Sequence, residues 1–385
     1  MTPGARVAAA IEILDSINDG QPAEAALTRW ARGSRFAGSG DRAAVRDFVY
    51  DALRHWRSDA ERGGGTSGRA RMIGRLRCAD LECETYFNGV GHAPEPLSEQ
   101  ETSAGQAPET TGDLWNLPDW LVEIFKSSLG DAAETTALAL TQRAPVTLRV
   151  NTTRTDRDAV QAQLRSEGVQ TVPNPRAPTA LTVTEGPRRL RNASSYLTGL
   201  VEMQDASSQA AILGISGTGR ALDYCAGGGG KSLALAALGW TVTAHDIDEG
   251  RMRDLPVRAT RGGHDIKQCS PDNVGTAGLF DLVLCDAPCS GAGTWRRAPE
   301  AKWALTPDRL DALITLQVDV LDASIKHVEP GGQLVYATCS VLPRENMGQV
   351  DAFLTRHDGW RLVRSESWSV DASGDGFFVA VLSKT

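Results

Sequence analysis

The stretch Asp281-Leu-Val-Leu-Cys-Asp-Ala-Pro-Cys-Ser-Gly291 decides the fold. Its apolar first half runs into Asp286-Ala-Pro-Cys289, which is typical of a buried strand that ends in a polar loop. A second stretch, Gln333-Leu-Val-Tyr-Ala-Thr-Cys-Ser340, has the same design. In an open parallel sheet, ligands bind at the carboxyl ends of the strands. The two stretches therefore predict two strands that each deliver one cysteine to a strand end.

Outward from this stretch, the chain from about residue 203 alternates between expected strands and helices. The expected strands are 221–224, 241–244, 282–285, 334–337 and 377–382, the expected helices are 231–238, 306–328 and 345–355, and residues 250–278 show no clear pattern. Thr306 and Pro307 are typical of a helix start, and Pro330-Gly-Gly is expected to end that helix. Alternating βα units predict a doubly wound, Rossmann-like α/β domain over residues 201–385.

Three further parts are expected before this domain, consistent with a chain of 385 residues that is too long for one ordinary core. They are an all-α domain over residues 1–91, a flexible acidic linker over 92–113 and a small α+β module over 114–200. In the first part, Asp41 is expected to cap a helix. In the third, Pro118 is expected early in a helix, with strands at 146–151 and 181–184 around a helix at about 156–167.

Composition places the chain among ordinary globular proteins, with 41% hydrophobic and 23% charged residues. No run of about 18 apolar residues predicts a membrane span, and no secretory signal is recognisable, so we expect a cytoplasmic protein. Seven cysteines without a regular framework are typical of free thiols in a reducing compartment. No C-x-x-C pair occurs, so we expect no metal site.

The net charge of −8 hides two arginine-rich stretches. Residues 29–77 hold twelve arginines against five acidic residues, and residues 143–191 hold nine against four. Arginine enrichment of this kind suits contacts with phosphate groups. Solvated helix faces would give the same pattern, so charge alone leaves both interpretations open.

A glycine-rich turn follows the first expected strand of the C-terminal domain, in Asp223-Tyr-Cys-Ala-Gly-Gly-Gly-Gly-Lys-Ser232. Glycines at such a turn let the backbone approach a ligand and direct helix N–H groups at it. A phosphate-binding P-loop is the rival interpretation, but it needs a glycine where Cys225 stands. Asp246 closes the next strand, where a carboxylate suits a ribose diol. A tight turn with a capping aspartate is the simpler alternative.

The chain from about 200 to 355 resembles the RsmB/Sun family of RNA (cytosine-5) methyltransferases. The resemblance is carried by four motifs: Glu202-Met-Gln-Asp-Ala-Ser-Ser-Gln209, the glycine-rich turn, Asp286-Ala-Pro-Cys-Ser-Gly291 and Tyr336-Ala-Thr-Cys-Ser-Val-Leu-Pro-Arg-Glu-Asn346. The segment Thr294-Trp-Arg-Arg-Ala-Pro-Glu-Ala-Lys-Trp303 is also similar to the family. More loosely, Asp41-Arg-Ala-Ala-Val-Arg-Asp-Phe-Val-Tyr-Asp-Ala-Leu-Arg54 resembles the family's NusB-like RNA-binding domain.

The resemblance implies S-adenosylmethionine as cofactor, RNA as partner and a monomer acting on small-subunit (16S) rRNA. It makes Cys339 the nucleophile, Cys289 the residue that assists product release, and Asp286 the group facing both cofactor and base. The cofactor would be held by Cys225, Ala226, Gly227, Gly228, Gly229, Gly230, Lys231, Asp246 and Ser270. RNA would meet Arg296, Arg297 and Lys302, the helical domain and the α+β module, whereas Trp295 and Trp303 either stack on bases or belong to the core.

Two positions depart from the family pattern. Gly228 stands where the family's turn has proline, which should loosen the turn without removing its N–H groups. Ser270 stands where the family has an acidic residue near the adenine, with Asp272 two residues further on.

Two cysteines fit this chemistry. Carbon 5 of cytosine is a poor nucleophile until a thiolate adds to carbon 6, and a second thiol can assist the elimination that follows. The attacking sulfur must be a thiolate, so its pKa should be lowered by nearby charge or hydrogen bonds. Cys285, Cys78, Cys83 and Cys269 are expected to be structural.

Other functions remain to be weighed against this one. They are a tRNA cytosine-5 methyltransferase, a catalytically silent RNA-binding assembly factor, a P-loop NTPase and a DNA cytosine-5 methyltransferase with Cys289 as nucleophile. The silent factor is disfavoured because Cys289, Cys339, Asp286 and Lys231 are all present. The DNA enzymes lack the second Thr-Cys-Ser strand end.

Overall fold

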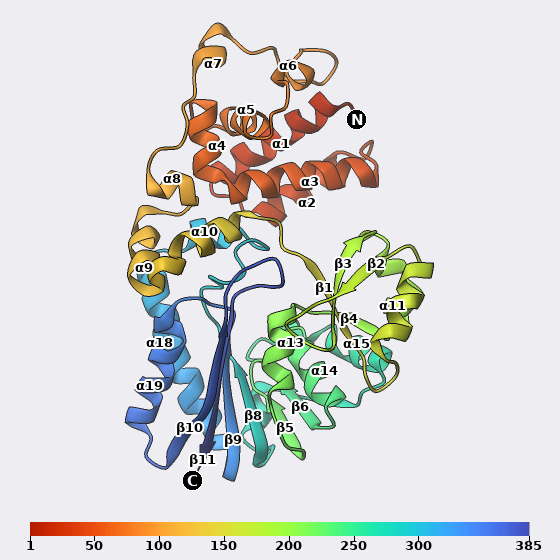
Figure 1. Cartoon of the computed structure of the whole chain (residues 1–385), viewed down its shortest axis with the longest axis vertical. Helices are drawn as coiled ribbons and strands as arrows, with labels where there is room; N and C mark the ends of the chain where they lie inside the picture. Colours follow the sequence, from red (N-terminus) through yellow and green to blue (C-terminus); the bar gives the residue numbers. More distant parts are fainter. Residues whose placement is uncertain (385) are drawn as a thin grey trace. The chain divides into compact units, whose positions relative to one another are not determined.

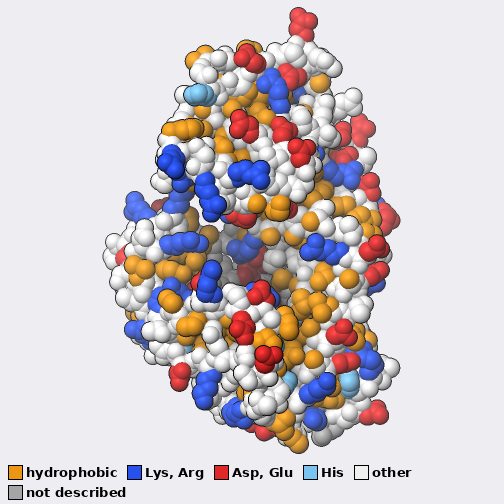
Figure 2. Space-filling model, turned by 180° about the vertical axis from the view of Figure 1, so that it is seen from behind, with side chains coloured by type: hydrophobic (Ala, Val, Ile, Leu, Met, Phe, Trp, Pro, Cys, Tyr) orange, Lys and Arg blue, Asp and Glu red, His pale blue; other side chains and the backbone are white. Residues whose placement is uncertain are grey.

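The computed structural model describes residues 1–384 and divides the chain into two compact units (Figure 1). Unit 1 comprises Met1–Arg143 and Trp295–Ala304, and unit 2 comprises Ala144–Thr294 and Leu305–Thr385. In the described residues, no helix is both long enough and apolar enough to cross a membrane. Acidic and basic side chains are interspersed over the face shown in Figure 2, so the net negative charge does not form a uniform surface there.

Unit 1 is helical. Its helices are α1 (Pro3–Asn18), α2 (Ala23–Gly33), α3 (Ser39–Arg54), α4 (Trp56–Gly63), α5 (Gly68–Cys78), α6 (Cys83–Tyr86), α7 (Glu99–Ser103), α8 (Thr111–Trp115), α9 (Asp119–Leu129), η1 (Gly130–Ala132), α10 (Ala133–Thr141) and α17 (Glu300–Ala304). Buried apolar side chains of α1, α3 and α5, among them Leu14, Leu53 and Met72, form its core. Each fully buried side chain of this size stabilises the fold by about 1.5–3 kcal/mol.

The structure differs from the sequence-based expectations for this unit in three places. Asp41 was expected at the cap of α3 but is its third residue, with Gly38 at the N-cap position; its carboxylate accepts hydrogen bonds from the Gly38 N–H, as in a capping box, and from the Met1 amine. The expected linker, 92–113, contains the short helices α7 and α8, and Arg77 donates hydrogen bonds to backbone carbonyls in it. Residues 114–143 group with the helical unit rather than with the α+β module.

Unit 2 begins with an antiparallel sheet of strand order β2-β3-β1-β4. Its elements are β1 (Val146–Val150), α11 (Arg157–Ser166), β2 (Gln170–Pro173), β3 (Ala180–Glu185), η2 (Leu190–Asn192), α12 (Ser194–Leu197) and β4 (Val201–Met203). Asp156 caps α11 by accepting a hydrogen bond from the Ala159 N–H. One face of the sheet packs Leu148 and Val150 against Val160 and Leu164 of α11.

The second sheet of unit 2 has seven strands in the order β10-β11-β9-β8-β5-β6-β7. The strands are β5 (Arg220–Asp223), β6 (Thr241–His245), β7 (Ile266–Cys269), β8 (Phe280–Asp286), β9 (Val328–Thr338), β10 (Trp360–Trp368) and β11 (Phe377–Lys384). Those from β5 to β9 run parallel, and β10 and β11 are antiparallel. The strand order reverses between β5 and β8, which makes their carboxyl ends the expected place for a ligand.

Helices connect the strands of this sheet: α13 (Ala206–Leu213), α14 (Gly230–Ala237), η3 (Glu249–Met252), α15 (Leu255–Gly262), α16 (Pro271–Val274), α18 (Pro307–Ser324), η4 (Ile325–His327), η5 (Pro343–Glu345) and α19 (Met347–Arg356). The expected Rossmann-like fold is therefore confirmed. Within β8, Leu282 and Leu284 belong to one buried cluster, whereas Val283 and Cys285 belong to another. The prediction that Cys285 is a buried, structural residue is also confirmed.

The connection before β9 differs from expectation. Helix α18 ends at Ser324, and Pro330-Gly-Gly lies inside β9 rather than after a helix. The pairing of β9 with β8 jumps from Phe280–Val328 to Leu282–Gln333, so the residues between form a bulge. Gly331 has a φ of +78°, which a side chain would disfavour. A bulge thus uses residues that would ordinarily end a helix.

Candidate active site

The ends of β8 and β9 bring two cysteines together. Cys289 lies in the loop after β8 and Cys339 directly follows β9, and their sulfur atoms are 3.5 Å apart. The Thr294 hydroxyl lies 3.9 Å from the Cys339 sulfur. The structure thus joins the two cysteines that the sequence placed at separate strand ends. None of the other five cysteines pairs in a disulfide, and neither do these two.

The two thiols differ in acidity. The two sulfur atoms share a hydrogen bond in which either thiol can be the donor, and this bond lowers the pKa of Cys339 and raises the pKa of Cys289 well above its ordinary value. Burial and the Asp286 charge work against the lowering, whereas the Lys231 charge adds to it. Cys339 is therefore the member of the pair that is more readily a thiolate, the nucleophilic form of cysteine.

A buried carboxylate joins the two cysteine loops. Glu345, which is fully buried, accepts hydrogen bonds from the Ser290 N–H (2.7 Å), the Ser290 hydroxyl (2.5 Å) and the Ser340 hydroxyl (2.5 Å). The amide of Gln317, on α18, also donates to it at 3.0 Å. Since Ser290 follows Cys289 and Ser340 follows Cys339, one side chain fixes both loops. Sequence reasoning did not assign Glu345 a role, although it stands in one of the four motifs.

Asp286 and Lys231 form an ion pair beside the cysteines. The Lys231 Nζ is 2.6 Å from an Asp286 oxygen and 5.0 Å from the centre of the Phe377 ring. Burial acts to lower the pKa of Lys231, but the charge and hydrogen bond of Asp286, together with the charges of Cys339 and Asp223, raise that pKa. Lys231 is thus a fixed cation, which holds Asp286 at the end of β8.

The glycine-rich turn lines a cavity of about 240 Å³ at the ends of β5 and β8. Its lining residues are Gln204, Ser208, Asp223, Cys225, Ala226, Gly227, Gly228, Gly230, Lys231, Arg251 and Asp286. Gly229 has a φ of +79°, and a Cβ there would lie 2.3 Å from Leu255. The turn therefore needs glycine at this position both for its backbone conformation and for its packing.

Arginines brace this turn from outside. Arg258, on α15, donates a hydrogen bond to the Gly228 carbonyl and lies 3.4 Å from Glu202, while Arg149 donates to the Gly230 carbonyl at 2.9 Å. Burial lowers the pKa of Arg149 to about 10. Gly228 was expected to loosen the turn, and these bonds supply an alternative restraint.

Most of the predicted cofactor residues surround this cavity, and one further group suits a polar ligand. Asp223 is buried, the Ser232 hydroxyl donates to one of its oxygens, and the other oxygen has no partner among the described residues. Burial raises the pKa of Asp223 to about 7. An unsatisfied carboxylate oxygen on the wall of a cavity fits a cationic or N–H-bearing ligand.

Three predicted cofactor residues, Gly229, Asp246 and Ser270, lie outside the cavity lining. Asp246 is 1% exposed and accepts hydrogen bonds from the N–H groups of Gly227 and Asp248, with Arg251 3.1 Å away. Ser270 accepts a hydrogen bond from the Asn273 side chain at the start of α16, and Asp272 is exposed. A role of Asp246 in ribose binding and of Ser270 near the adenine stays a prediction.

Gln204, Ser208 and Arg251 line the cavity but were not predicted as cofactor residues. For Gln204 and Ser208 a signal existed, because both stand in the Glu202–Gln209 motif. For Arg251 there was none, since residues 250–278 show no clear pattern.

The basic segment after the Cys289 loop requires a correction. Arg296 is 2% and Lys302 1% exposed, so these side chains do not present their charges to solvent as the predicted RNA contacts would require. Lys302 donates to the Arg54 carbonyl at 3.3 Å, and burial lowers its pKa to about 7. Arg297 is exposed, and its contact with RNA stays a prediction.

Both tryptophans of this segment pack within unit 1. Trp295 is buried and stacks on Phe125 with ring centres 6.0 Å apart, and the Trp303 indole N–H donates to the Leu53 carbonyl at 2.8 Å. Trp295 was expected either to stack on bases or to belong to the core, and the structure places it in the core. Residues 1–384 contain no cluster of His, Cys, Asp and Glu that could hold a metal ion.

Comparison with known proteins gives two family matches. The model of the 16S rRNA methyltransferase RsmB/F family matches residues 210–383, and that of a ferredoxin-like domain of RsmF/B-like methyltransferases matches residues 117–188. Among curated proteins, ribosomal RNA small subunit methyltransferase B of Vibrio cholerae is 35% identical over 306 residues, covering 74% of this chain and 69% of the relative. The protein of that name from Salmonella typhi is 35% identical and covers 69% of this chain and 66% of the relative.

Solved structures agree in fold. A methyltransferase homolog from Pyrococcus horikoshii is 25% identical with a TM-score of 0.62 and covers 70% of this chain and 96% of that one. The crystal structure of PH0851 is 24% identical with a TM-score of 0.80 and covers 100% of this chain and 99% of that one.

Proposed function

The chain belongs to the RsmB/F family of S-adenosylmethionine-dependent methyltransferases, and from this premise we propose that it methylates carbon 5 of a cytosine in 16S rRNA. The main observation behind this proposal is that the sulfur atoms of Cys289 and Cys339 lie 3.5 Å apart after the ends of β8 and β9. Of these two thiols, Cys339 has the lowered pKa. Small-subunit rRNA is favoured as substrate by the names of the curated relatives.

Cys339 is the proposed nucleophile. Its thiolate adds to carbon 6 of the cytosine, which forms an S–C6 bond and makes carbon 5 nucleophilic. Once carbon 5 carries the methyl group, loss of its proton and cleavage of the S–C6 bond restore the aromatic ring and the thiolate. The lowered pKa of Cys339 supports this assignment.

Cys289 and Asp286 have complementary proposed roles. The Cys289 sulfur lies close enough to Cys339 to take part in proton transfer while the adduct breaks down. Asp286, which forms an ion pair with Lys231, would contact the cytosine ring and stabilise its protonated form as the thiolate adds. Asp286 ends β8, the strand that pairs with β9, and Cys289 lies in the loop that follows β8.

The cavity beside the cysteines is the proposed cofactor site. When bound, S-adenosylmethionine supplies an electrophilic methyl group. The N–H groups of the glycine-rich turn, the unpartnered Asp223 oxygen and Gln204 would hold its polar parts, because all three line the cavity. Lys231 and Asp286 line this cavity, and their charges also act on the Cys339 thiol.

Substitution of each cysteine tests the proposal. Cys339→Ala should abolish methyl transfer to RNA, because no other nucleophile is placed to attack carbon 6. Cys289→Ala should accumulate a covalent protein–RNA adduct, seen as a shifted band on a denaturing gel. Bisulfite sequencing of total RNA with and without the protein would identify the cytosine.

The matched control is Cys285→Ala, which removes a buried thiol of the same strand outside the proposed chemistry. It should retain methyl transfer and accumulate no adduct. Full activity of Cys339→Ala would overturn the proposal, and an adduct with Cys339→Ala but not with Cys289→Ala would reverse the two roles.

A further inference from the structure

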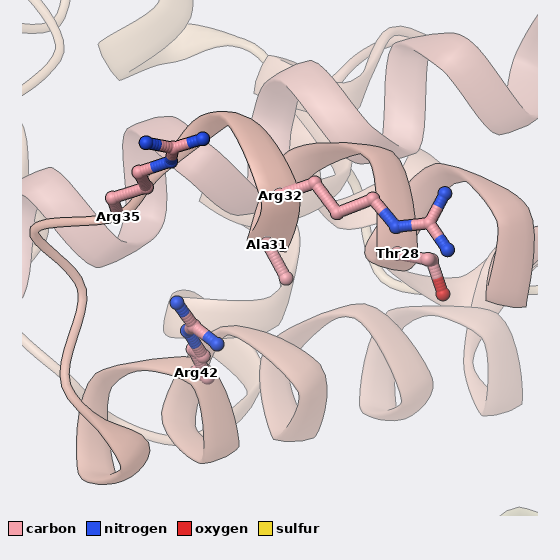
Figure 3. Close-up of a pocket in the computed structure, with 5 residues that line it drawn as sticks. All are labelled: Thr28, Ala31, Arg32, Arg35 and Arg42. Carbon is pink, nitrogen blue, oxygen red and sulfur yellow. The ribbon is translucent and has the colours of Figure 1, made fainter.

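A groove between α2 and α3 in unit 1 concentrates positive charge. Its main cavity of about 550 Å³ is lined by Thr28, Ala31, Arg32, Arg35 and Arg42 (Figure 3). Arg32 belongs to α2 and Arg35 to the turn after it, and Arg42 rises toward them from the start of α3. An adjoining cavity of about 270 Å³ shares Thr28, Ala31 and Arg42 and adds Trp30 and Arg46.

The three arginines of the main cavity lack acidic partners. Among residues 1–384, no acidic side chain forms an ion pair with Arg32, Arg35 or Arg42, and all three are exposed. The acidic residues nearby are already engaged. They are Glu24, which pairs with Arg46 and Tyr50, Asp41, which pairs with the Met1 amine and Arg6, and Asp47, which pairs with Arg143.

This arrangement is costly without a ligand. Like charges gathered on neighbouring helix turns repel one another. The chain as a whole carries a net charge of −8, so this positive cluster is opposite in sign to the charge of the protein. An anion placed between α2 and α3 would relieve the repulsion. Guanidinium groups bind phosphate oxygens through paired hydrogen bonds, which a fork of three arginines can repeat along a backbone.

We propose that this arginine groove binds consecutive phosphate groups of the RNA substrate, an inference that rests on the proposed function for the identity of the polyanion. The arginines would contact phosphates, and the Thr28 hydroxyl can donate one further hydrogen bond. Trp30 is half-buried and lines the adjoining cavity, and the exposed part of its ring would stack on a base. The groove belongs to unit 1, whereas the residues proposed to carry the chemistry belong to unit 2.

The test compares two charge-matched triple variants of the full chain. The groove variant is Arg32→Gln with Arg35→Gln and Arg42→Gln. The control is Arg165→Gln with Arg309→Gln and Arg361→Gln, which removes three exposed arginines of unit 2. The probe is 16S rRNA transcribed in vitro, its affinity is measured by filter binding from 50 to 300 mM salt, and circular dichroism checks that both variants are folded.

The groove variant should weaken RNA binding and lower the slope of log K against log salt by about 2 to 3, because each lost phosphate contact contributes about 0.7–0.9. The control variant should keep a slope close to that of the unsubstituted protein. Equal slopes for the two variants would overturn the groove as an RNA site and point to another anionic partner, such as an acidic peptide.

Methyl transfer measured in parallel separates this inference from the proposed function. If the groove variant loses the salt slope while the unsubstituted protein transfers no methyl group, the groove stands and the enzymatic proposal falls. If the unsubstituted protein methylates RNA while the groove variant binds with an unchanged slope, the groove falls and the enzymatic proposal stands.

Discussion

Cys289 and Cys339 carry identical side chains, and their hydrogen bond makes the pKa of Cys339 the lower of the two. The Cys289 thiol is the largest cause of the lowered pKa of Cys339. We therefore predict that Cys289→Ala raises the pKa of Cys339, whereas Cys289→Ser keeps it lower because a hydroxyl still donates. The rate of alkylation of Cys339 by iodoacetamide, followed by mass spectrometry across pH 6–10, measures this pKa.

The sign of the effect follows from the thiolate. Alkylation is fast above the pKa, so the midpoint of the rate profile should move to higher pH in Cys289→Ala. It should lie below that midpoint in Cys289→Ser. Coincident midpoints for the two variants would show that Lys231 and Thr294 alone set the acidity of Cys339.

Glu345 acts on both cysteines through their neighbouring serines. In Glu345→Gln, one of the two carboxylate oxygens is replaced by an NH2 group, which cannot accept a hydrogen bond. At least one of the three buried donors, the Ser290 N–H and the hydroxyls of Ser290 and Ser340, then loses its partner. We expect a loss of about 1–3 kcal/mol in the free energy of unfolding. We also expect a lower kcat with an unchanged KM for RNA, because the loops move relative to each other while the RNA contacts stay.

A geometric measurement distinguishes positioning from mere stabilisation. Sulfur atoms 3.5 Å apart need only a small movement to form a disulfide, so mild oxidation should crosslink Cys289 to Cys339 quickly in the unsubstituted protein. Glu345→Gln should crosslink more slowly. The control is Gln349→Glu, a buried α19 residue that does not contact either loop in the described bonds. An unchanged crosslinking rate in Glu345→Gln would contradict the positioning role.

At the residue scale, sequence motifs could predict the groups at the strand ends but not their outer contacts. Cys339 and Asp286 are marked by the strand that precedes them. Arg258 reaches the Gly228 carbonyl only because α15 folds back over the turn. A charged loop sequence likewise predicts side chains that are exposed to solvent. Lys302 is instead buried and donates a hydrogen bond to the carbonyl of Arg54, which lies far away in the chain.

The glycine-rich turn and α14 illustrate the scale of elements, because one position has two separate requirements. Gly229 has a positive φ and also packs against Leu255, whereas Gly239, after α14, has a φ of +93° and no atom within 4 Å of the place that a Cβ would take. Gly239→Ala should therefore cost only the backbone strain, about 1–2 kcal/mol. Gly229→Ala should cost more and also weaken binding of S-adenosylmethionine.

Urea denaturation measures the two stabilities, and isothermal titration calorimetry measures cofactor affinity. Both glycines have φ in the left-handed region, so both variants carry the backbone strain. Only Gly229→Ala adds a steric clash with Leu255, and the comparison therefore separates the two effects. If Gly229→Ala binds the cofactor as tightly as Gly239→Ala, the close packing of the turn on α15 is not needed for the cofactor site.

Burial also explains which elements could be predicted from sequence. Strands β8 and β11 are largely buried and read as apolar runs, and the buried part of β5 is the short apolar pair Ala221-Leu222. Strands β7 and β10 lie at the two edges of the sheet and are largely exposed, so Lys267 and Gln268 interrupt any apolar pattern in β7. The bulge in β9 could not be predicted either, because Pro330-Gly-Gly has the same local signal as a helix end.

At the scale of the whole molecule, the chain enters unit 1 twice. Residues 295–304 follow Thr294 of unit 2 but pack with unit 1, through Trp295 on Phe125 and Trp303 on the Leu53 carbonyl. A fragment spanning residues 144–385 would keep this segment and lose its partners. We predict that such a fragment exposes residues 295–304 and loses methyl transfer, since the segment starts close to the Cys289 loop.

Limited trypsin digestion tests this dependence, because Arg296 and Lys302 are trypsin sites that are buried in the full chain. The fragment should be cut at both sites much faster than the full chain. Arg361, on the exposed edge strand β10, should be cut at similar rates in both proteins and serves as the internal control. Equal protection of residues 295–304 in the two proteins would mean that unit 2 orders this segment alone, and the helical unit would then be dispensable for the architecture of the cysteine loops.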